Sequence, residues 1–390
     1  MSNPVARPLA QGIHADLILA PVGASSPSVD ALAPPQWIDV ADSAVAAAAR
    51  RLVLKIVVAQ KNGVSQARRP HDVVREVRVL EKARHSNIVP LLSYEFNAAL
   101  LEHTLTFPLL ALTLTDLLAS EVACRHVVDL FAYTAKGVFA ALQHLHSLGL
   151  AHRDINPANI MVDWHGVPRL IDFGTAWDPN RRGDDGHGGM SCAVGAGPYR
   201  APELLFSPPT YDAQAVDLWG AGVSLAEFFR PRGTRASSVS DFGGSDTSDS
   251  PDPSQFEPPD LTGLQLTQPP AVLFSSQFGE LGLAASIFRL LGTPTHDSWP
   301  SFSSLPDAGK MPFDVQPARL LRDALELDNS VGTSSAGTAI VDCLEALVRL
   351  EPAARRSATE TLRVLECVAQ NEVAGVLQPL LEATATQYRV

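Results

Sequence analysis

The pattern of apolar and polar positions predicts strands and one helix early in the chain. Residues 52–59 (LVLKIVVA) form an almost unbroken aliphatic run rich in β-branched residues, which is typical of a buried strand. Short apolar runs across residues 88–118 indicate further strands. Between these regions, apolar residues recur at helical spacing over 73–80. Pro70 lies just before them, and proline is favoured at a helix start, where its missing N–H would lack a partner.

Later in the chain the periodicity becomes helical. Residues 126–147 follow the helical period, residues 340–350 form an apolar stretch, and another helix is expected from about Ala358. Strands with one helix, followed mostly by helices, predict an α+β fold. We expect a small β-rich lobe with one main helix, stacked on a larger and mainly helical lobe.

Two segments have compositions that do not favour packing. Residues 1–35 are rich in Ala, Pro and Ser, and we predict that they are disordered. Residues 231–270 are mainly Ser, Asp, Pro and Gly, which indicates an acidic low-complexity insertion in a loop. The predicted division is a small lobe over 36–110 and a large lobe over 111–385 that carries this insertion.

Composition narrows the function classes. The chain of 390 residues has a formal net charge of −12 and no block of Lys and Arg, which argues against nucleic-acid binding. Its four cysteines are scattered without a C-x-x-C pair, as in proteins of a reducing interior. No apolar run reaches the roughly 18 residues of a membrane span, and no signal peptide is evident. We expect a protein of the cytoplasm, the nucleus or both, without a membrane partner.

Three motifs follow one another in a fixed order. Residues 152–159 read HRDINPAN, residues 172–174 read DFG, and residues 201–203 read APE. Each short motif alone is weak, but together they match the H-R-D-x-x-x-x-N, D-F-G and A-P-E series. Over roughly residues 50–370, apart from the acidic insertion, the chain resembles the eukaryotic protein kinases. The resemblance implies a two-lobed kinase fold with ATP and Mg²⁺ as cofactors.

The same resemblance assigns roles to residues in these motifs. Asp154 is expected to accept the proton of the substrate hydroxyl, and Asn156 lies beside it in the catalytic loop. Asn159 and Asp172 offer oxygens to Mg²⁺, which prefers such hard ligands. Transfer of a phosphoryl group depends mainly on positioning and charge neutralisation, so these residues are our candidates for catalysis and metal binding.

Further residues are expected to hold ATP. Lys55 lies in the middle of the predicted strand, where the family has a lysine that binds the α- and β-phosphates. Glu76 on the following helix is its expected ion-pair partner. The linker between the lobes is placed at Phe107 to Leu110, with Phe107 and Leu109 beside the adenine. A ligand between two lobes is the usual arrangement.

Two other matches imply structural roles. Asp217, in the sequence VDLWG, resembles the buried aspartate that accepts backbone N–H groups of the catalytic loop. Arg355 resembles the arginine that pairs with the glutamate of A-P-E, here Glu203.

The branch of the family is indicated by residues around these motifs. Tyr199 and Arg200 precede A-P-E directly, residues 292–294 read GTP, and residues 299–300 read WP. These features are similar to those of the cyclin-dependent-kinase-like (CMGC) branch, whose members phosphorylate serine or threonine of proteins. A protein substrate is therefore implied.

The region before Lys55 and the catalytic loop depart from the family pattern. No glycine occurs over residues 24–61, so we expect no glycine-rich phosphate loop, and alanine side chains over 44–49 would partly obstruct the phosphates. Asn156 stands where serine/threonine kinases usually have a lysine, and Ala196 stands in place of a threonine.

The activation segment also departs from the pattern. Arg75 and Arg153 could bind an activating phosphate, but Trp177 replaces a third arginine, and Ser191 falls where a phosphorylated threonine would lie. The missing phosphate loop and the incomplete arginine pocket resemble the fungal single-subunit kinases that activate cyclin-dependent kinases without a cyclin.

Three functions remain open from the sequence. The first is an active, monomeric serine/threonine kinase that phosphorylates a cyclin-dependent kinase in cell-cycle or transcription control. The second is a pseudokinase scaffold, favoured by the altered phosphate loop and by Asn156. The third is a binding module unrelated to kinases. Cyclin binding and modification of Ser191 are left undecided.

Overall fold

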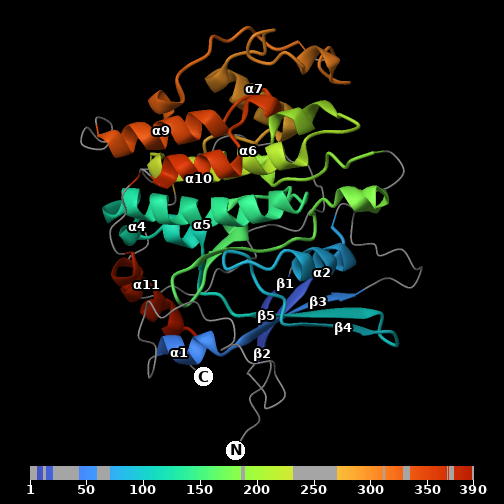
Figure 1. The fold of residues 1–390 in the computed structure, drawn as a ribbon, viewed down its shortest axis with the longest axis vertical. Helices are drawn as coiled ribbons and strands as arrows, with labels where there is room; N and C mark the ends of the chain where they lie inside the picture. Colours follow the sequence, from blue (N-terminus) through green and yellow to red (C-terminus); the bar gives the residue numbers. More distant parts are fainter. Residues whose placement is uncertain are drawn as a thin grey trace, which may run out of the picture.

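The computed structural model describes two stacked lobes (Figure 1). The described residues are 7–11, 15–20, 44–58, 71–185, 189–231, 270–310, 312–327, 334–366, 368 and 373–388. The predicted α+β class and two-lobed arrangement are confirmed. The predicted insertion over 231–270 lies outside the described residues, apart from its two ends.

The small lobe is built on a five-stranded antiparallel sheet with the strand order β1-β2-β3-β5-β4. One helix, α2, packs against it and begins at the capping residue Asp72, whose side chain accepts hydrogen bonds from the amides of Val74 and Arg75. The helix thereby gains partners for two of its first free N–H groups. The strands are β1 (Arg7–Gln11), β2 (Asp16–Ala20), β3 (Leu52–Val58), β4 (Ser93–Asn97) and β5 (Glu102–Pro108), and α2 spans Val73–Lys82.

Part of the N-terminal segment corrects our prediction of disorder over residues 1–35. Residues 7–11 and 16–20 form strands, while 1–6, 12–14 and 21–35 lie outside the described residues. Strands β1 and β2 form within it, and β2 pairs with β3 over its whole length, from Asp16 with Ile56 to Ala20 with Leu52. Each strand has only five residues; β1 pairs with β2, and β2 pairs with β3, whose residues lie far along the chain. A segment stabilised mainly by a distant partner shows little local periodicity. The small lobe therefore begins with β1 rather than at residue 36.

The alanine-rich segment before β3 also differs from expectation. Residues Ala44–Ala49 form the short helix α1, with Val45 and Ala48 buried. This helix packs against α11 (Ala374–Thr386) near the C-terminus, as Figure 1 shows. It is not the segment that connects β1 to β2, so its side chains do not take the place of the phosphate loop.

The large lobe contains most of the helices. Its longest described helix, α5, confirms the helix predicted over 126–147, and α9 and α10 confirm the two helices predicted near the C-terminus. A small sheet has the strand order β6-β7-β8. The catalytic loop over residues 152–159 leads directly into β7. The elements are β6 (Leu112–Thr113), β7 (Ile160–Val162), β8 (Pro168–Leu170), α3 (Leu114–Leu118), α4 (Glu121–Arg125), α5 (Val127–Ser147), α6 (Ala213–Ala226), α7 (Gly279–Leu291), α9 (Ser335–Leu347) and α10 (Ala358–Glu366). None of the helices in the described part of the chain has the length and apolar character that a membrane-spanning segment needs.

Helix α6 lies in the centre of this lobe and explains how distant segments are fixed. Its residue Trp219 is fully buried and stacks on Phe274 at 5.5 Å between ring centroids. The guanidinium of Arg355 lies over the same Trp219 ring and forms a two-bond ion pair with Glu203, with both distances 2.7 Å. The predicted pairing of Arg355 with Glu203 is confirmed. A buried pair of this kind holds its partners because either charge alone would be costly.

The end of α6 carries a carboxyl group that titrates near neutral pH. The Tyr199 hydroxyl donates a hydrogen bond of 2.6 Å to Glu227 Oε1, directly after α6. Burial raises the pKa of Glu227 to about 7. The folded state therefore binds this proton more tightly than the unfolded chain, where the pKa is about 4.5. The resulting stabilisation is complete below pH 4.5 and is lost as the pH rises through 7.

We predict that Glu227→Gln removes this pH dependence. Glutamine keeps an acceptor for Tyr199 and stays neutral, so the variant should be more stable than the native chain at pH 8, by about 3 kcal/mol at most. Thermal unfolding midpoints measured from pH 5 to pH 8 test this, with the exposed Glu382→Gln as control. Parallel pH profiles for the native chain and Glu227→Gln would contradict the assignment.

Candidate active site

The centre of the site is a lysine held between two carboxylates. Lys55 Nζ on β3 lies 2.8 Å from Glu76 Oε2 on α2 and 3.0 Å from Asp172 Oδ1. The predicted partner Glu76 is therefore in place, and the structure adds a second contact to Asp172. Burial by itself lowers the pKa of Lys55, but these two carboxylates raise it well above its ordinary value. The lysine is thus charged at neutral pH.

Asp172 is positioned by an unusual backbone conformation. Its φ angle of 58° lies in the left-handed region, which non-glycine residues seldom adopt without compensation. The next residue, Phe173, is fully buried and packs against the His152 ring at 4.6 Å. Although burial alone would raise it, the pKa of Asp172 is lowered, chiefly by Lys55. The carboxylate is therefore ionised and suited to a metal ion.

The start of α2 is attached to the same segment. The amide of Asp72 donates a 2.9 Å hydrogen bond to the carbonyl of Gly174. Since Glu76 lies one turn further along α2, this bond couples the position of Glu76 to that of Asp172. The ion pair of Lys55 and the conformation of the D-F-G segment are therefore linked.

The carboxylate of Asp154 is oriented by two asparagines. Asn159 Nδ2 donates to Asp154 Oδ2 at 2.9 Å, and Asn156 Nδ2 donates to Asp154 Oδ1 at 3.0 Å. Asn156 Oδ1 accepts from the amides of Ala158 and Asn159 and so caps the short 3₁₀ turn that follows. Burial and the neighbouring Asp172 raise the pKa of Asp154. Asn156 thus organises the loop through hydrogen bonds and adds no charge.

The backbone of the catalytic loop is held by Asp217 on α6. This fully buried carboxylate accepts hydrogen bonds from the amides of His152 at 2.9 Å and Arg153 at 2.6 Å. It also lies 2.9 Å from His146 Nε2 on α5. The predicted role of Asp217 is confirmed, and His146 is a partner that the sequence analysis did not identify.

The predicted linker residues lie where β5 leaves the small lobe. Phe107 is buried at the end of β5, opposite Val53 on β3. The amide of Leu109 donates to the carbonyl of Arg51 at 2.9 Å, after which the chain continues into β6. These positions are compatible with our placement of Phe107 and Leu109 beside the adenine, which stays a prediction.

The segment that the sequence analysis searched for a phosphate loop forms α1, whereas strands β1 and β2 precede β3 in the sheet. The sequence that joins β1 to β2 is therefore the candidate for a phosphate loop. Residues 10–15 read AQGIHA. Against the G-x-G-x-x-G motif, Gly12 matches the second of the three glycines, and Ala10 and Ala15 replace the first and the last. Residues 12–14 lie outside the described residues. The G-x-G-x-x-G spacing could thus have been found in the sequence, but it lies within residues 1–35, which we had expected to be disordered.

The donor set fits ATP and Mg²⁺. Asn159 gives its amide N–H to Asp154, which leaves its Oδ1 as the atom able to bind a metal. Asp172 engages Lys55 through Oδ1 and has a second carboxylate oxygen. An amide oxygen and a carboxylate are hard oxygen ligands of the kind that Mg²⁺ takes. Lys55 is the cation on this side of the site that could bind the phosphates.

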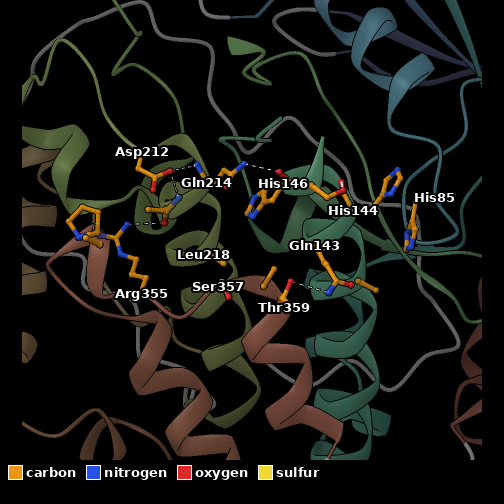
Figure 2. Close-up of a pocket in the computed structure, with 16 residues that line it drawn as sticks. His85, Gln143, His144, His146, Asp212, Gln214, Leu218, Arg355, Ser357 and Thr359 are labelled. Carbon is orange, nitrogen blue, oxygen red and sulfur yellow. Dashed lines mark hydrogen bonds between the residues drawn. The ribbon is translucent and has the colours of Figure 1, made fainter. Parts of the chain in front are cut away.

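A second hollow lies behind the catalytic loop and away from these residues. It has a volume of about 740 Å³ and is lined by α5, the start of α6 and the start of α10. Figure 2 shows Gln143 of α5 bonded to Thr359 of α10 at its wall, at 3.0 Å. None of the predicted site residues lines it. Its link to the site runs through His146, which contacts Asp217.

A two-lobed fold that brings a strand lysine, a helix glutamate and a loop aspartate to one place between the lobes defines the protein kinase class. A family model for the protein kinase domain matches residues 40–238, and the chain belongs to this family. Its members are ATP-dependent phosphotransferases that use Mg²⁺. The matched residues begin after β1 and β2, in agreement with the altered phosphate loop.

The curated relatives are protein kinases and include a cyclin-dependent kinase. The chain is 29% identical to cyclin-dependent kinase 7 of Xenopus laevis over 297 residues, which cover 74% of this chain and 66% of that protein. It is 28% identical to the serine/threonine-protein kinase csk1 of Schizosaccharomyces pombe, over 71% of this chain and 78% of that protein. The prediction of a cyclin-dependent-kinase-like protein kinase is confirmed.

Two solved structures share the fold. One is the CAK complex of Chaetomium thermophilum bound to ATP-γ-S, with a TM-score of 0.59, 24% identity, and coverage of 92% of this chain and 88% of that one. The other is the yeast RNA Pol II CTD kinase complex CTDK-1, with a TM-score of 0.59, 19% identity, and coverage of 93% and 92%. At these identities the likeness concerns the fold.

We predict that Asn156→Ala lowers kcat by about ten- to a hundredfold, because Asp154 loses one of its two orienting amides. The KM for ATP should change little, since Lys55 and Asp172 keep their contacts. Steady-state kinetics on a peptide substrate measure both constants, with the exposed Asn180→Ala as control. An unchanged kcat would show that Asn159 alone orients Asp154.

Proposed function

We propose that this chain is an active serine/threonine kinase and that it phosphorylates the activation segment of a cyclin-dependent kinase. The observation that carries the proposal is the complete contact network of the site. Lys55 contacts both Glu76 and Asp172, and Asp154 is held by two asparagine side chains. The Lys55–Glu76 ion pair, Asp172 and Asp154 are the parts that must be in place for phosphoryl transfer.

In the proposed mechanism, the residues act on a bound nucleotide and a protein hydroxyl. Asn159 and Asp172 would hold Mg²⁺, and the ion would supply neutralisation of phosphate charge. Lys55 binds the non-transferred phosphates and is itself fixed by Glu76. Asp154 orients the substrate hydroxyl and accepts its proton as the bond from that oxygen to the γ-phosphorus forms. The bond from the γ-phosphorus to the β,γ-bridging oxygen breaks, and ADP is the leaving group. Because burial raises the pKa of Asp154, the loss of activity towards acid pH begins at a higher pH than for an ordinary aspartate.

The choice of substrate rests on the relatives and on the departures from the family pattern. One named relative is a cyclin-dependent kinase, the other is a serine/threonine-protein kinase, and one similar structure is that of a CAK complex. The chain spans 66% of the length of the Xenopus relative, so substrate and partners are proposals for this chain. We propose that it acts as a monomer without a cyclin, in the nucleus, the cytoplasm or both.

A pseudokinase scaffold is the second candidate. It is favoured by Ala10 and Ala15, which replace two glycines of the phosphate loop, and by the uncharged Asn156. Against it stands the buried Lys55 network, because a scaffold has no need to keep a charged lysine between two carboxylates. Burying such charges is costly unless they are used or paired.

The test is transfer of labelled phosphate from Mg-ATP to an unphosphorylated cyclin-dependent kinase by the purified chain, without cyclin. We expect labelling of the substrate's activation segment, and a loss of about 10²–10⁴-fold in Asp154→Asn, the usual contribution of a general base. The exposed Asp323→Asn serves as the matched control.

The other outcomes separate the candidates. Labelling of generic serine peptides but not of the cyclin-dependent kinase would keep the kinase and reject the substrate. No transfer at all by a chain that is still stabilised by Mg-ATP would favour the scaffold.

A further inference from the structure

One aspartate of the activation segment is fully buried between two arginines. The carboxylate of Asp185 lies 3.0 Å from Arg75 Nη2, and Arg153 reaches it with two bonds of 2.5 and 2.9 Å. The exposed fractions of the three side chains are 0% for Asp185, 3% for Arg75 and 0% for Arg153. This geometry is that of a fork-like guanidinium pair on a carboxylate.

The surroundings hold this carboxylate in place. The amide of Ser191 donates to Asp185 Oδ2 at 3.0 Å. Tyr211 accepts from Arg153 Nη1 at 3.0 Å and donates its own hydroxyl to the carbonyl of Ser191 at 2.6 Å. Trp177 lies against the Arg153 guanidinium at 5.3 Å from its ring centroid. The arginine pocket that looked incomplete in the sequence therefore contains a carboxylate and further hydrogen-bond partners.

The charges require an anion at this place. Two guanidinium groups buried within a few ångströms of each other repel and lose their hydration. Although burial alone would raise it, the pKa of Asp185 is lowered, chiefly by Arg153, so the group is ionised. Its single negative charge matches the reduced pocket, in which Trp177 occupies the position where the resemblance implied a third arginine.

Both arginines are directly connected to the site. Arg75 precedes Glu76 on α2, and Arg153 precedes Asp154 in the catalytic loop. Arg153 also has a φ angle of 67°, so its backbone depends on its surroundings for stability. A carboxylate that binds both side chains therefore ties the helix of Glu76 to the loop of Asp154.

We propose that Asp185 is a positioning residue that keeps this kinase in its active arrangement without phosphorylation of the activation segment. The inference rests on the proposed function and deepens it by naming how the site is regulated. Its carboxylate supplies the anionic charge that the two arginines bind. The control of the Lys55–Glu76 pair, which other kinases assign to a phosphorylated residue, is here built into the chain.

Ser191 has a different part in this arrangement. It contacts the pocket through its backbone amide, while its hydroxyl accepts a 3.3 Å hydrogen bond from the amide of Ala193. A phosphate on Ser191 would have to compete with Asp185 for the same guanidinium groups. Modification of Ser191 is therefore not required for activity.

The experiment compares the full-length native chain, treated with phosphatase and checked by mass spectrometry, with four variants. Asp185→Asn removes the charge and keeps the shape, and Asp185→Glu keeps the charge. Ser191→Ala removes the hydroxyl, and Asp342→Asn removes an exposed ion pair with Arg356 as control. All are assayed below their unfolding temperatures for kcat, for KM of ATP and for Mg-ATP affinity.

We expect the phosphate-free native chain and Ser191→Ala to keep full kcat. Asp185→Asn should lose about tenfold or more in kcat and bind Mg-ATP more weakly, within the range usual for coupling between two sites. Asp185→Glu should recover most of that loss. A purely structural residue would lower the unfolding temperature without this kinetic pattern, and Asp342→Asn should leave the kinetics unchanged.

Three results would overturn the proposal: native kinetics in Asp185→Asn, inactivation of the native chain by phosphatase, or an inactive Ser191→Ala. If the native chain transfers no phosphate at all, the proposed function fails, and Mg-ATP affinity then decides about Asp185. Weaker binding by Asp185→Asn would still support its role in positioning, and equal binding would reject it.

Discussion

The arrangement of the active site depends on one partly buried cation, the ammonium of Lys55. It belongs to β3, its partner Glu76 belongs to α2, and its second partner Asp172 begins the activation segment. Three separate parts of the chain must therefore meet at one atom. The exposed fractions of the side chains are 16% for Lys55, 3% for Glu76 and 31% for Asp172, so each charge would be less favourable without its partners. The contacts of Lys55 with Glu76 and Asp172 also hold the candidate nucleotide-binding residues in fixed positions relative to one another.

Other buried carboxylates hold the catalytic loop. Asp217 on α6 binds the backbone of the loop, and Asp185 binds the side chain of Arg153. Arg355 and Glu203 join the end of the activation segment to the C-terminal helices in the same way. Each interaction connects segments far apart in the sequence. The active arrangement is thus encoded as a set of charge pairs between distant segments.

Much of the site could be predicted because its chemistry depends on fixed residue types at fixed local spacing. The loop from His152 to Asn159 and the pair of Lys55 with Glu76 were identified in this way, and the structure brings them together. The prediction was wrong for the described strands β1 and β2, because five-residue strands in an Ala- and Pro-rich segment form by pairing with each other and, through β2, with the distant β3. The sequence between these strands, with G-x-G-x-x-G spacing around Gly12, was therefore not considered as a phosphate loop.

The sequence by itself determined the fold class, the kinase family and the residues of the catalytic loop, because motifs with strict spacing and hydrophobic periodicity are local properties. Only the tertiary structure decided which charge fills the pocket of Arg75 and Arg153, since Asp185 is one acidic residue among several in its segment. It also decided that Asn156 bonds to Asp154 and caps the turn behind it. Such contacts depend on how distant or differently oriented groups meet in space, and a linear pattern does not contain that information.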